Sequence, residues 1–250
     1  MSDQKLFIVI PAYNEEENIK SVIEDWYPVV EKNNADGTSR LLIIDDGSKD
    51  STYSMLKEYA KTRPLLLPLT KKNGGHGATV LYGYHYALTQ GADYVFQTDS
   101  DGQTLPSEFE QFWELRDQYD MVIGHRNKRE DGISRLIVTK ILRAVVGLCF
   151  RVRVIDANTP FRLMKAEGLR YNIQYVPSDF NLSNVILSVI YAKRKQRVKY
   201  IPITFRPRQG GVNSINLKKI SKIGVKAFND FRTINKALKQ LKNDKSGETI

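Results

Sequence analysis

Two aspartates separated by one residue could bind a metal ion. Asp99 and Asp101 flank Ser100, and Gln103 follows two residues later, directly after the apolar run Tyr94–Gln97. Carboxylate and amide oxygens are hard ligands that suit Mg²⁺ or Mn²⁺, and such an ion could bridge the diphosphate of a nucleotide. The same pattern occurs in solvated loops, but the buried strand before it and the turn after it favour a metal site.

Two other polar segments also follow apolar runs. Asp45-Asp46-Gly47-Ser48 comes after the run at 41–44, and Pro11-Ala12-Tyr13-Asn14-Glu15 comes after the run at 6–10. Side chains of these types could hydrogen-bond a base or a ribose. Asx turns and helix capping use the same residue types, so each segment taken alone is ambiguous.

Strand-like runs alternate with helix-like segments up to Gly124, a pattern typical of an α/β fold with a mostly parallel sheet covered on both faces. Ligands of such sheets bind outside the carboxyl ends of the strands, so the three polar segments should share one edge. The expected strands are 6–10, 41–44, 65–69, 94–97, 121–124 and 199–205. The expected helices include 14–33 with Asn14 as N-cap, one from Pro106 with a Ser107–Glu110 capping box, Ser134–Phe150 and Asp179–Tyr191.

In this order the three segments resemble the family 2 glycosyltransferases of the GT-A fold. Within that family they are most similar to the branch of dolichyl-phosphate mannose synthase and related polyprenyl-phosphate glycosyltransferases. The matching segments are 9–16, 44–52, 73–78 and 98–103. The resemblance implies a metal-dependent, inverting glycosyltransferase of the hexosyltransferase class. Its donor would be a nucleotide-diphosphate sugar, and its acceptor a polyprenyl phosphate or a lipid-linked glycan.

The resemblance also implies which residues bind the donor. Mg²⁺ or Mn²⁺ would be held by Asp99, Asp101 and Gln103. The family commonly has a lysine where this chain has His76, which leaves the phosphate role of that loop open. The nucleotide-sugar residues would be Pro11, Ala12, Tyr13, Glu15, Asp45, Asp46, Gly77, Asp99, Ser100 and Arg208.

Arginines later in the chain could bind phosphates, because a guanidinium can clamp phosphate oxygens bidentately. Arg126 and Arg135 are assigned to catalysis; Arg129, with Asp156 and Arg162, is assigned to the phosphate or acceptor. Salt bridges with neighbouring acids are the plainer alternative for the loop at 126–135. A second loop, 206–214, would close over the donor and exclude water.

Asp179 bears on the choice of acceptor. A sugar hydroxyl needs a general base, whereas a lipid phosphate is already an anion. Asp179 could be that base, or it could simply cap the helix that follows.

The net charge of +10 is concentrated at the C-terminus, where residues 215–250 hold nine basic and three acidic side chains. Apolar residues recur there every three or four positions, which predicts a basic amphipathic helical tail (213–250) after a catalytic domain (1–212). The tail could lie on an anionic membrane, on its own domain or on a second subunit of a homo-oligomer. We expect a cytoplasmic enzyme bound peripherally at the inner face of the membrane.

Other classes fit the sequence less well. Cys149 is the only cysteine, which excludes an intramolecular disulfide framework and a cysteine-rich zinc site. A sugar nucleotidyltransferase would usually carry a glycine-rich basic loop after its first strand, but the segment at 11–15 is acidic and lacks glycine. A non-enzymatic nucleic-acid binder would fit the charge, but no nucleic-acid-binding motif accompanies it.

Overall fold

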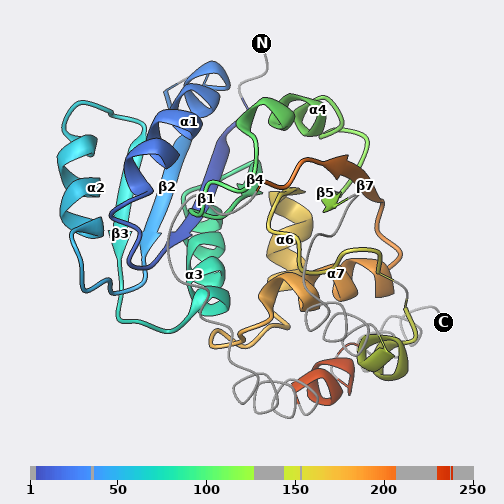
Figure 1. Cartoon of the computed structure of the whole chain (residues 1–250). Coiled ribbons are helices and arrows are strands. Elements are labelled where there is room, and N and C mark those ends of the chain that lie inside the picture. The colour runs from blue at the N-terminus through green and yellow to red at the C-terminus, as the bar shows by residue number, and fades with distance from the viewer. Residues whose placement is uncertain are drawn as a thin grey trace.

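The computed structural model describes residues 4–34, 37–126, 144–152, 154–206, 230–236 and 238. In this part of the chain, seven strands form one sheet in the order β3-β2-β1-β4-β6-β5-β7 (Figure 1). All neighbours are parallel except β6, which runs antiparallel to both β4 and β5. The strands are β1 (Leu6–Ala12), β2 (Arg40–Asp45), β3 (Leu66–Thr70), β4 (Tyr94–Gln97), β5 (Met121–Arg126), β6 (Arg162–Lys165) and β7 (Val198–Ile203).

Helices cover both faces of the sheet and bury a separate hydrophobic core on each. One core packs under α1, α2 and α4, and the other under α3, α6, α7 and the C-terminal residues 230–238. The helices are α1 (Ile19–Lys32), α2 (Thr52–Ala60), α3 (His76–Thr89), the 3-10 turn η1 (Pro106–Glu108), α4 (Phe109–Trp113), α6 (Ala166–Ile173) and α7 (Ser183–Lys193).

The central strand β1 explains why the sheet was visible in the sequence. All seven of its residues are buried. Phe7 and Val9 face the α3 core, whereas Leu6, Ile8 and Ile10 face the α1 core. A parallel strand that is buried on both faces appears in the sequence as a continuous apolar run.

Three helix boundaries differ from the prediction. Asn14 does not cap α1, because it has a φ of +54° and the helix begins only at Ile19. The Ser107–Glu110 capping box is not formed; no side chain caps α4, and Glu110 instead binds Lys32. Asp179 is not an N-cap either, since α7 begins at Ser183 with Leu182 before it. Before both α1 and α7, a polar turn occupies the residues at which we expected the helix to begin.

Strand β6 and helix α6 were not predicted. β6 has only four residues, and one of them is a buried arginine. A strand this short, interrupted by a charge, has no clear two-residue period. Of the helix expected at Ser134–Phe150, residues 144–150 are helical and the rest lies outside the described residues.

The described residues of the C-terminal tail pack on the rest of the chain. Phe231, Ile234 and Leu238 are buried in the α3 core, and Asn235 Nδ2 donates to Cys149 O over 2.7 Å. Among the three locations considered for the tail, this part therefore lies on its own domain. No helix within the described residues has both the length and the apolar character needed to cross a membrane.

Candidate active site at the carboxyl ends of β1, β2 and β4

The three polar segments meet at one edge of the sheet, as predicted. Because β1 lies between β2 and β4, their carboxyl ends are neighbours, with Ala12 paired to Asp45 in the β1–β2 register. Two hydrogen bonds join the first two loops: Asp46 N donates to Ala12 O (2.8 Å), and Asn14 N donates to Ser48 Oγ (2.9 Å). Thr98 N donates to Val9 O (3.2 Å) just before the third segment.

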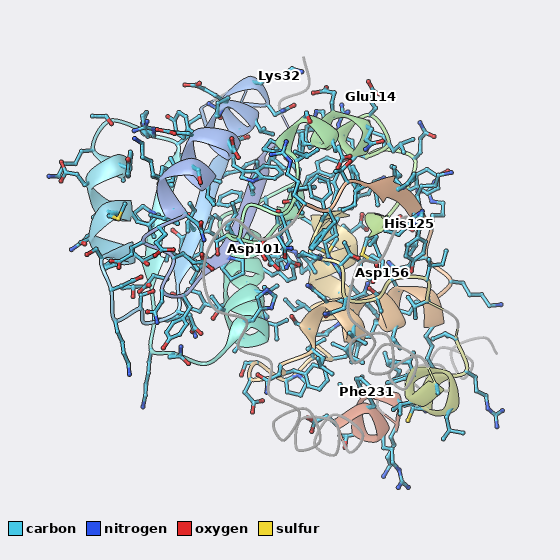
Figure 2. All side chains as sticks on the ribbon, viewed as in Figure 1. Lys32, Asp101, Glu114, His125, Asp156 and Phe231 are labelled. Carbon is cyan, nitrogen blue, oxygen red and sulfur yellow. The ribbon has the colours of Figure 1, made fainter. Side chains whose placement is uncertain are left out.

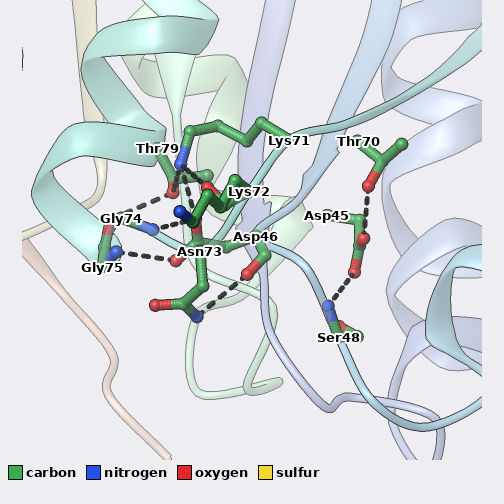
Figure 3. A network of polar contacts seen from close by, with 10 residues as sticks. All are labelled: Asp45, Asp46, Ser48, Thr70, Lys71, Lys72, Asn73, Gly74, Gly75 and Thr79. Carbon is green, nitrogen blue, oxygen red and sulfur yellow. Dashed lines mark hydrogen bonds and ion pairs between the residues drawn. The ribbon is translucent and has the colours of Figure 1, made fainter.

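The Asp45–Asp46 pair is buried and its carboxylates bind protein groups (Figure 3). Asp45 accepts from Ser48 N and Thr70 Oγ1, at 3.1 and 2.7 Å. Asp46 accepts from Lys71 Nζ at 2.6 Å and from two backbone amides, Gly74 N at 2.9 Å and Gly75 N at 2.8 Å. The hydrogen bonds that the two carboxylates accept thus hold the loops at this edge in place.

The Asp46 carboxylate is held in its ionised form. Burial alone would raise its pKa, but the hydrogen bonds from Lys71, the two glycine amides and Thr79 together lower the pKa below its ordinary value. Its backbone oxygen accepts from Asn73 Nδ2 over 2.9 Å. Gly47 is required beside it, because it has a φ of +70° and an added Cβ would lie 2.9 Å from Asn73 N.

Lys71 was not singled out from the sequence. Its ammonium bridges Asp46 and Lys72 O, and its side chain is only 19% exposed. It fixes the loop at 71–75, which leads into α3. The available signal was a lysine directly after β3, at the same edge of the sheet as Asp46, which directly follows β2.

The pair expected to bind metal lies after β4. Asp99 Oδ1 contacts His76 Nε2 over 2.9 Å and its side chain is 27% exposed, so it is partly accessible. Asp101 is buried and accepts from Gln103 N over 3.2 Å. Ser100 between them is also buried.

The oxygen atoms of Asp99, Asp101 and Gln103 suit a hard divalent ion whose coordination shell is completed by substrate. Within the described residues, no three His, Cys, Asp or Glu side chains cluster as a complete metal site. Mg²⁺ characteristically uses one or two carboxylates and completes its shell with waters and substrate phosphates. Asp99 and Asp101 match that set. Gln103 is used otherwise, because its Nε2 donates to Arg206 O over 2.9 Å, although its amide oxygen remains a possible ligand.

His76 lies among negative charges. Desolvation would lower the pKa of its imidazole, but the charges of Asp99, Asp101 and Asp46 and the hydrogen bond to Asp99 raise the pKa above its ordinary value. The ring is therefore a cation more readily than a free histidine, at the position where the family commonly has a lysine.

The segment at 11–15 brings the aromatic ring of Tyr13 and the carboxylate of Glu15 to this edge of the sheet. Pro11 and Ala12 are buried in β1, whereas Tyr13 is 43% exposed at the edge. The amide of Glu15 donates to Thr52 Oγ1 over 2.8 Å, and its carboxylate accepts from Asn18 Nδ2 over 2.7 Å. Tyr13 is thus the member of this segment that is most available to a ligand.

Arg162 is placed differently from the phosphate contact that we expected. It is fully buried at the start of β6. Its guanidinium donates to four groups of the loop at 157–159 and of α7, namely Ala157 O, Thr159 O, Asn184 O and Ser188 Oγ. Asp156 is buried beside that loop. Burial lowers the pKa of the Arg162 guanidinium from its ordinary value, and the charges of nearby groups, Tyr84 first and Asp156 among them, act in the opposite direction. Arg162 therefore ties the 157–159 loop to α7, and this burial argues against a direct contact with a phosphate.

Asp179 lies in an exposed turn at 178–182, before α7. Gly77, expected to bind the nucleotide sugar, is the second residue of α3 and faces this turn. The remaining predicted arginines give no side-chain information: Arg126 ends β5, but its side chain lies outside the described residues, as do Arg129, Arg135, Arg208 and the loop 207–214. Arg206, just before that loop, donates its amide to Gln103 O over 2.8 Å.

The sequence of the chain matches a known protein family. The sequence model described as Glycosyl transferase family 2 matches residues 7–207, most of the chain. The chain belongs to glycosyl transferase family 2. It is therefore a glycosyltransferase, and the resemblance found in its motifs is confirmed.

Two curated proteins with similar sequences carry names from the polyprenyl-phosphate branch. A polyprenol monophosphomannose synthase of Mycolicibacterium smegmatis is 25% identical over 222 residues, 85% of this chain and 82% of that protein. A UDP-N-acetylglucosamine–dolichyl-phosphate N-acetylglucosaminyltransferase of Methanococcus voltae is 29% identical over 155 residues. That match covers 56% of this chain and 59% of the relative, so the similarity spans little more than half of the Methanococcus protein.

Solved structures of other proteins share this architecture. Glucosyl-3-phosphoglycerate synthase of Mycobacterium tuberculosis, crystallised with Mn²⁺, UDP and glucosyl-3-phosphoglycerate, superposes with a TM-score of 0.63 at 17% identity, covering 92% of this chain and 80% of that one. S. aureus TarS 1–349 with UDP-GlcNAc gives a TM-score of 0.61 at 15% identity, covering 88% and 64%. At these identities the likeness concerns the fold, which is GT-A.

Proposed function

We propose that this glycosyltransferase moves a sugar from a nucleotide-diphosphate donor to a polyprenyl phosphate. The observation that carries the proposal is the edge where β1, β2 and β4 end together, with the exposed Tyr13 following β1 and with Asp99 and Asp101 following β4. Support for the acceptor comes from the printed names of the relatives, which act on polyprenol or dolichyl phosphate. A lipid-linked glycan is the alternative acceptor.

The donor would lie across the loops of this edge. We define the donor edge as residues 11–15, 45–48, 71–76 and 98–103. Tyr13 offers a flat apolar surface for a base, and the backbone of 45–48, fixed by the buried aspartates, offers groups for the ribose. Asp99 and Asp101, with the Gln103 amide oxygen as a further candidate, would hold Mg²⁺ or Mn²⁺, which when bound would offset the charge of the leaving diphosphate.

The acceptor would approach from the other side of the sugar. We define the acceptor side as residues 155–162 and the turn 178–182. For an inverting reaction, the acceptor oxygen attacks the anomeric carbon in line as the diphosphate leaves. A lipid phosphate needs no base, so Asp179 would then act only through its place in the turn. With a sugar hydroxyl as acceptor, Asp179 is the exposed carboxylate that could take the proton.

A donor screen tests this function. Purified full-length protein is incubated with Mn²⁺ and each of several nucleotide sugars, with and without polyprenyl phosphate. We expect release of nucleoside diphosphate that depends on the lipid phosphate and stops when the metal is chelated. Transfer only to a preformed lipid-linked sugar would move the assignment to a hydroxyl acceptor and to Asp179. Release of inorganic pyrophosphate instead would identify a nucleotidyltransferase.

The proposed acceptor also places the enzyme at a membrane surface. A polyprenyl phosphate sits in a bilayer, so the enzyme must work at its surface, and the exposed cations Arg232 and Lys236 would favour anionic lipids. Co-sedimentation with anionic vesicles, but not with neutral vesicles or random DNA, is the expected result. Binding to DNA alone would favour the nucleic-acid alternative.

A further inference from the structure

The turn at 178–182 lies directly on the first turn of α3. An ideal Cβ added to Gly77 would come within 2.3 Å of Phe180 O and 2.4 Å of Asn181 O. Nearby, Asn181 Oδ1 lies 3.3 Å from the Cβ position of Gly75, whose φ is +88°. The turn can come this close only because position 77 has no side chain.

This contact joins the donor edge to the acceptor side. Gly77 follows His76, whose ring contacts Asp99 over 2.9 Å, and the loop before it is bound by the Asp46 carboxylate. On the other side, Phe180 and Asn181 follow Asp179. One backbone contact therefore sets the spacing between the donor carboxylates and the acceptor-side turn.

The turn is also held from behind, by aromatic packing. The Phe180 ring is buried and its centroid lies 5.8 Å from that of Phe231, which in turn lies 5.5 Å from Phe150. Phe231 belongs to the C-terminal helix, residues 230–236. This helix lies beside residues 144–150 at the bottom of the view, and Asp101 lies near the centre of the molecule (Figure 2). The turn is therefore packed against α3 on one side and, through the Phe180 ring, against this helix on the other, so a methyl group added at position 77 must displace it.

We propose that Gly77 is a positioning residue for sugar transfer, and that its bare Cα sets the distance between the donor edge and the turn at 178–182. This inference rests on the proposed function. It replaces the expected contact of Gly77 with the nucleotide sugar by a contact with the acceptor side. Replacing Gly77 should therefore leave nucleotide binding intact and misplace the acceptor.

The first test compares Gly77→Ala with Gly147→Ala in the full-length protein. Gly147 lies in the helix at 144–150, and no atom of the described residues comes within 4 Å of its Cβ position, so it is a matched glycine-to-alanine control. Calorimetry gives the affinity for Mn²⁺ and the nucleoside diphosphate released in the donor screen, and initial rates give kcat and the KM for polyprenyl phosphate. For Gly77→Ala we expect unchanged nucleotide affinity and a kcat lower by about 100-fold, the scale of a 1 Å misplacement.

For Gly147→Ala we expect wild-type values of both quantities. Wild-type kcat in Gly77→Ala would overturn the proposal, and so would a loss of nucleotide affinity as large as the loss of kcat. Failure of the proposed function has a different signature, because then the wild-type protein itself neither binds nucleoside diphosphate with Mn²⁺ nor transfers sugar.

A second pair of variants approaches the turn from its other side and decides the matter if Gly77→Ala does not fold. Phe231→Ala removes the ring behind Phe180, whereas Ile234→Ala removes a buried aliphatic side chain of the same helix. After the two unfolding temperatures are compared, we expect Phe231→Ala to lower kcat several-fold more than Ile234→Ala, at equal nucleotide affinity. Leucine at position 231 should restore part of the rate. Equal kcat in the two alanine variants would overturn the proposal.

Discussion

The donor edge and the acceptor side are held in place by different interactions. At the donor edge, short polar loops are fixed by carboxylates that accept backbone and lysine hydrogen bonds, with Asp46 as the central acceptor. On the acceptor side, a buried cation, Arg162, donates to carbonyls of one loop and one helix, and aromatic packing holds the turn. The first arrangement depends on negative charge and the second on a buried positive charge, so they should fail under different perturbations.

The largest expected effect concerns the metal at the donor edge. Asp101→Asn should lower kcat for transfer on the order of 1,000-fold, because the ion that offsets the leaving-group charge loses a ligand. Stability should change little, which thermal unfolding checks. Glu114→Gln changes an exposed acid just after α4, well away from Asp101 in Figure 2, and is the control that should keep full activity. Full transfer by Asp101→Asn without added metal would show that the donor edge does not use a metal ion.

The second prediction addresses the buried cation of the acceptor side. Arg162→Met should lower the free energy of unfolding by roughly 3–5 kcal/mol, because it leaves the buried carbonyl oxygens that accept from the guanidinium without this donor. Denaturant unfolding measures this, with Arg197→Met as a surface control expected to change stability by less than about 0.5 kcal/mol. A loss of activity at full stability would instead restore Arg162 as a substrate contact.

The smallest predicted effect is a pH dependence that belongs to the donor edge alone. Because hydrogen bonds lower the pKa of Asp46 in the folded state, its stabilisation is fully present above the ordinary aspartate pKa and is lost as pH falls through the lower, folded-state pKa. Asp46→Asn should therefore cost about 1–3 kcal/mol at pH 7 and much less in acid. Urea unfolding from pH 7 to pH 2.5 measures the difference.

The exposed Glu58→Gln serves as the control for that titration, and its unfolding curve should follow the wild type at each pH. A cost of Asp46→Asn that stays constant with pH would mean that Lys71, Thr79 and the two glycine amides do not hold the carboxylate in its ionised form.

The donor edge was predictable from the sequence, and the acceptor side largely was not. At the donor edge, each ligand candidate directly follows an apolar strand such as β4, and parallel topology then brings the strand ends together. The contacts of Asp46 with the loop at 71–75 were not visible, because nothing local in the sequence pairs Asp46 with Gly74. The acceptor side depends on long-range contacts: a buried arginine in a four-residue strand, and a glycine whose partner lies more than a hundred residues later.

The antiparallel strand β6 also constrains the order in which the chain can assemble. β1 to β4 are made first and can pair through short parallel crossovers, so the donor edge can form while the chain is still being synthesised. In the described sheet, β5 reaches β4 only through β6, which is made about forty residues after β5 begins. β5 therefore emerges from the ribosome with no neighbour to pair with and must wait for residues 162–165. The acceptor side therefore forms after the donor edge, and β5 stays exposed to misfolding if synthesis pauses between the two strands.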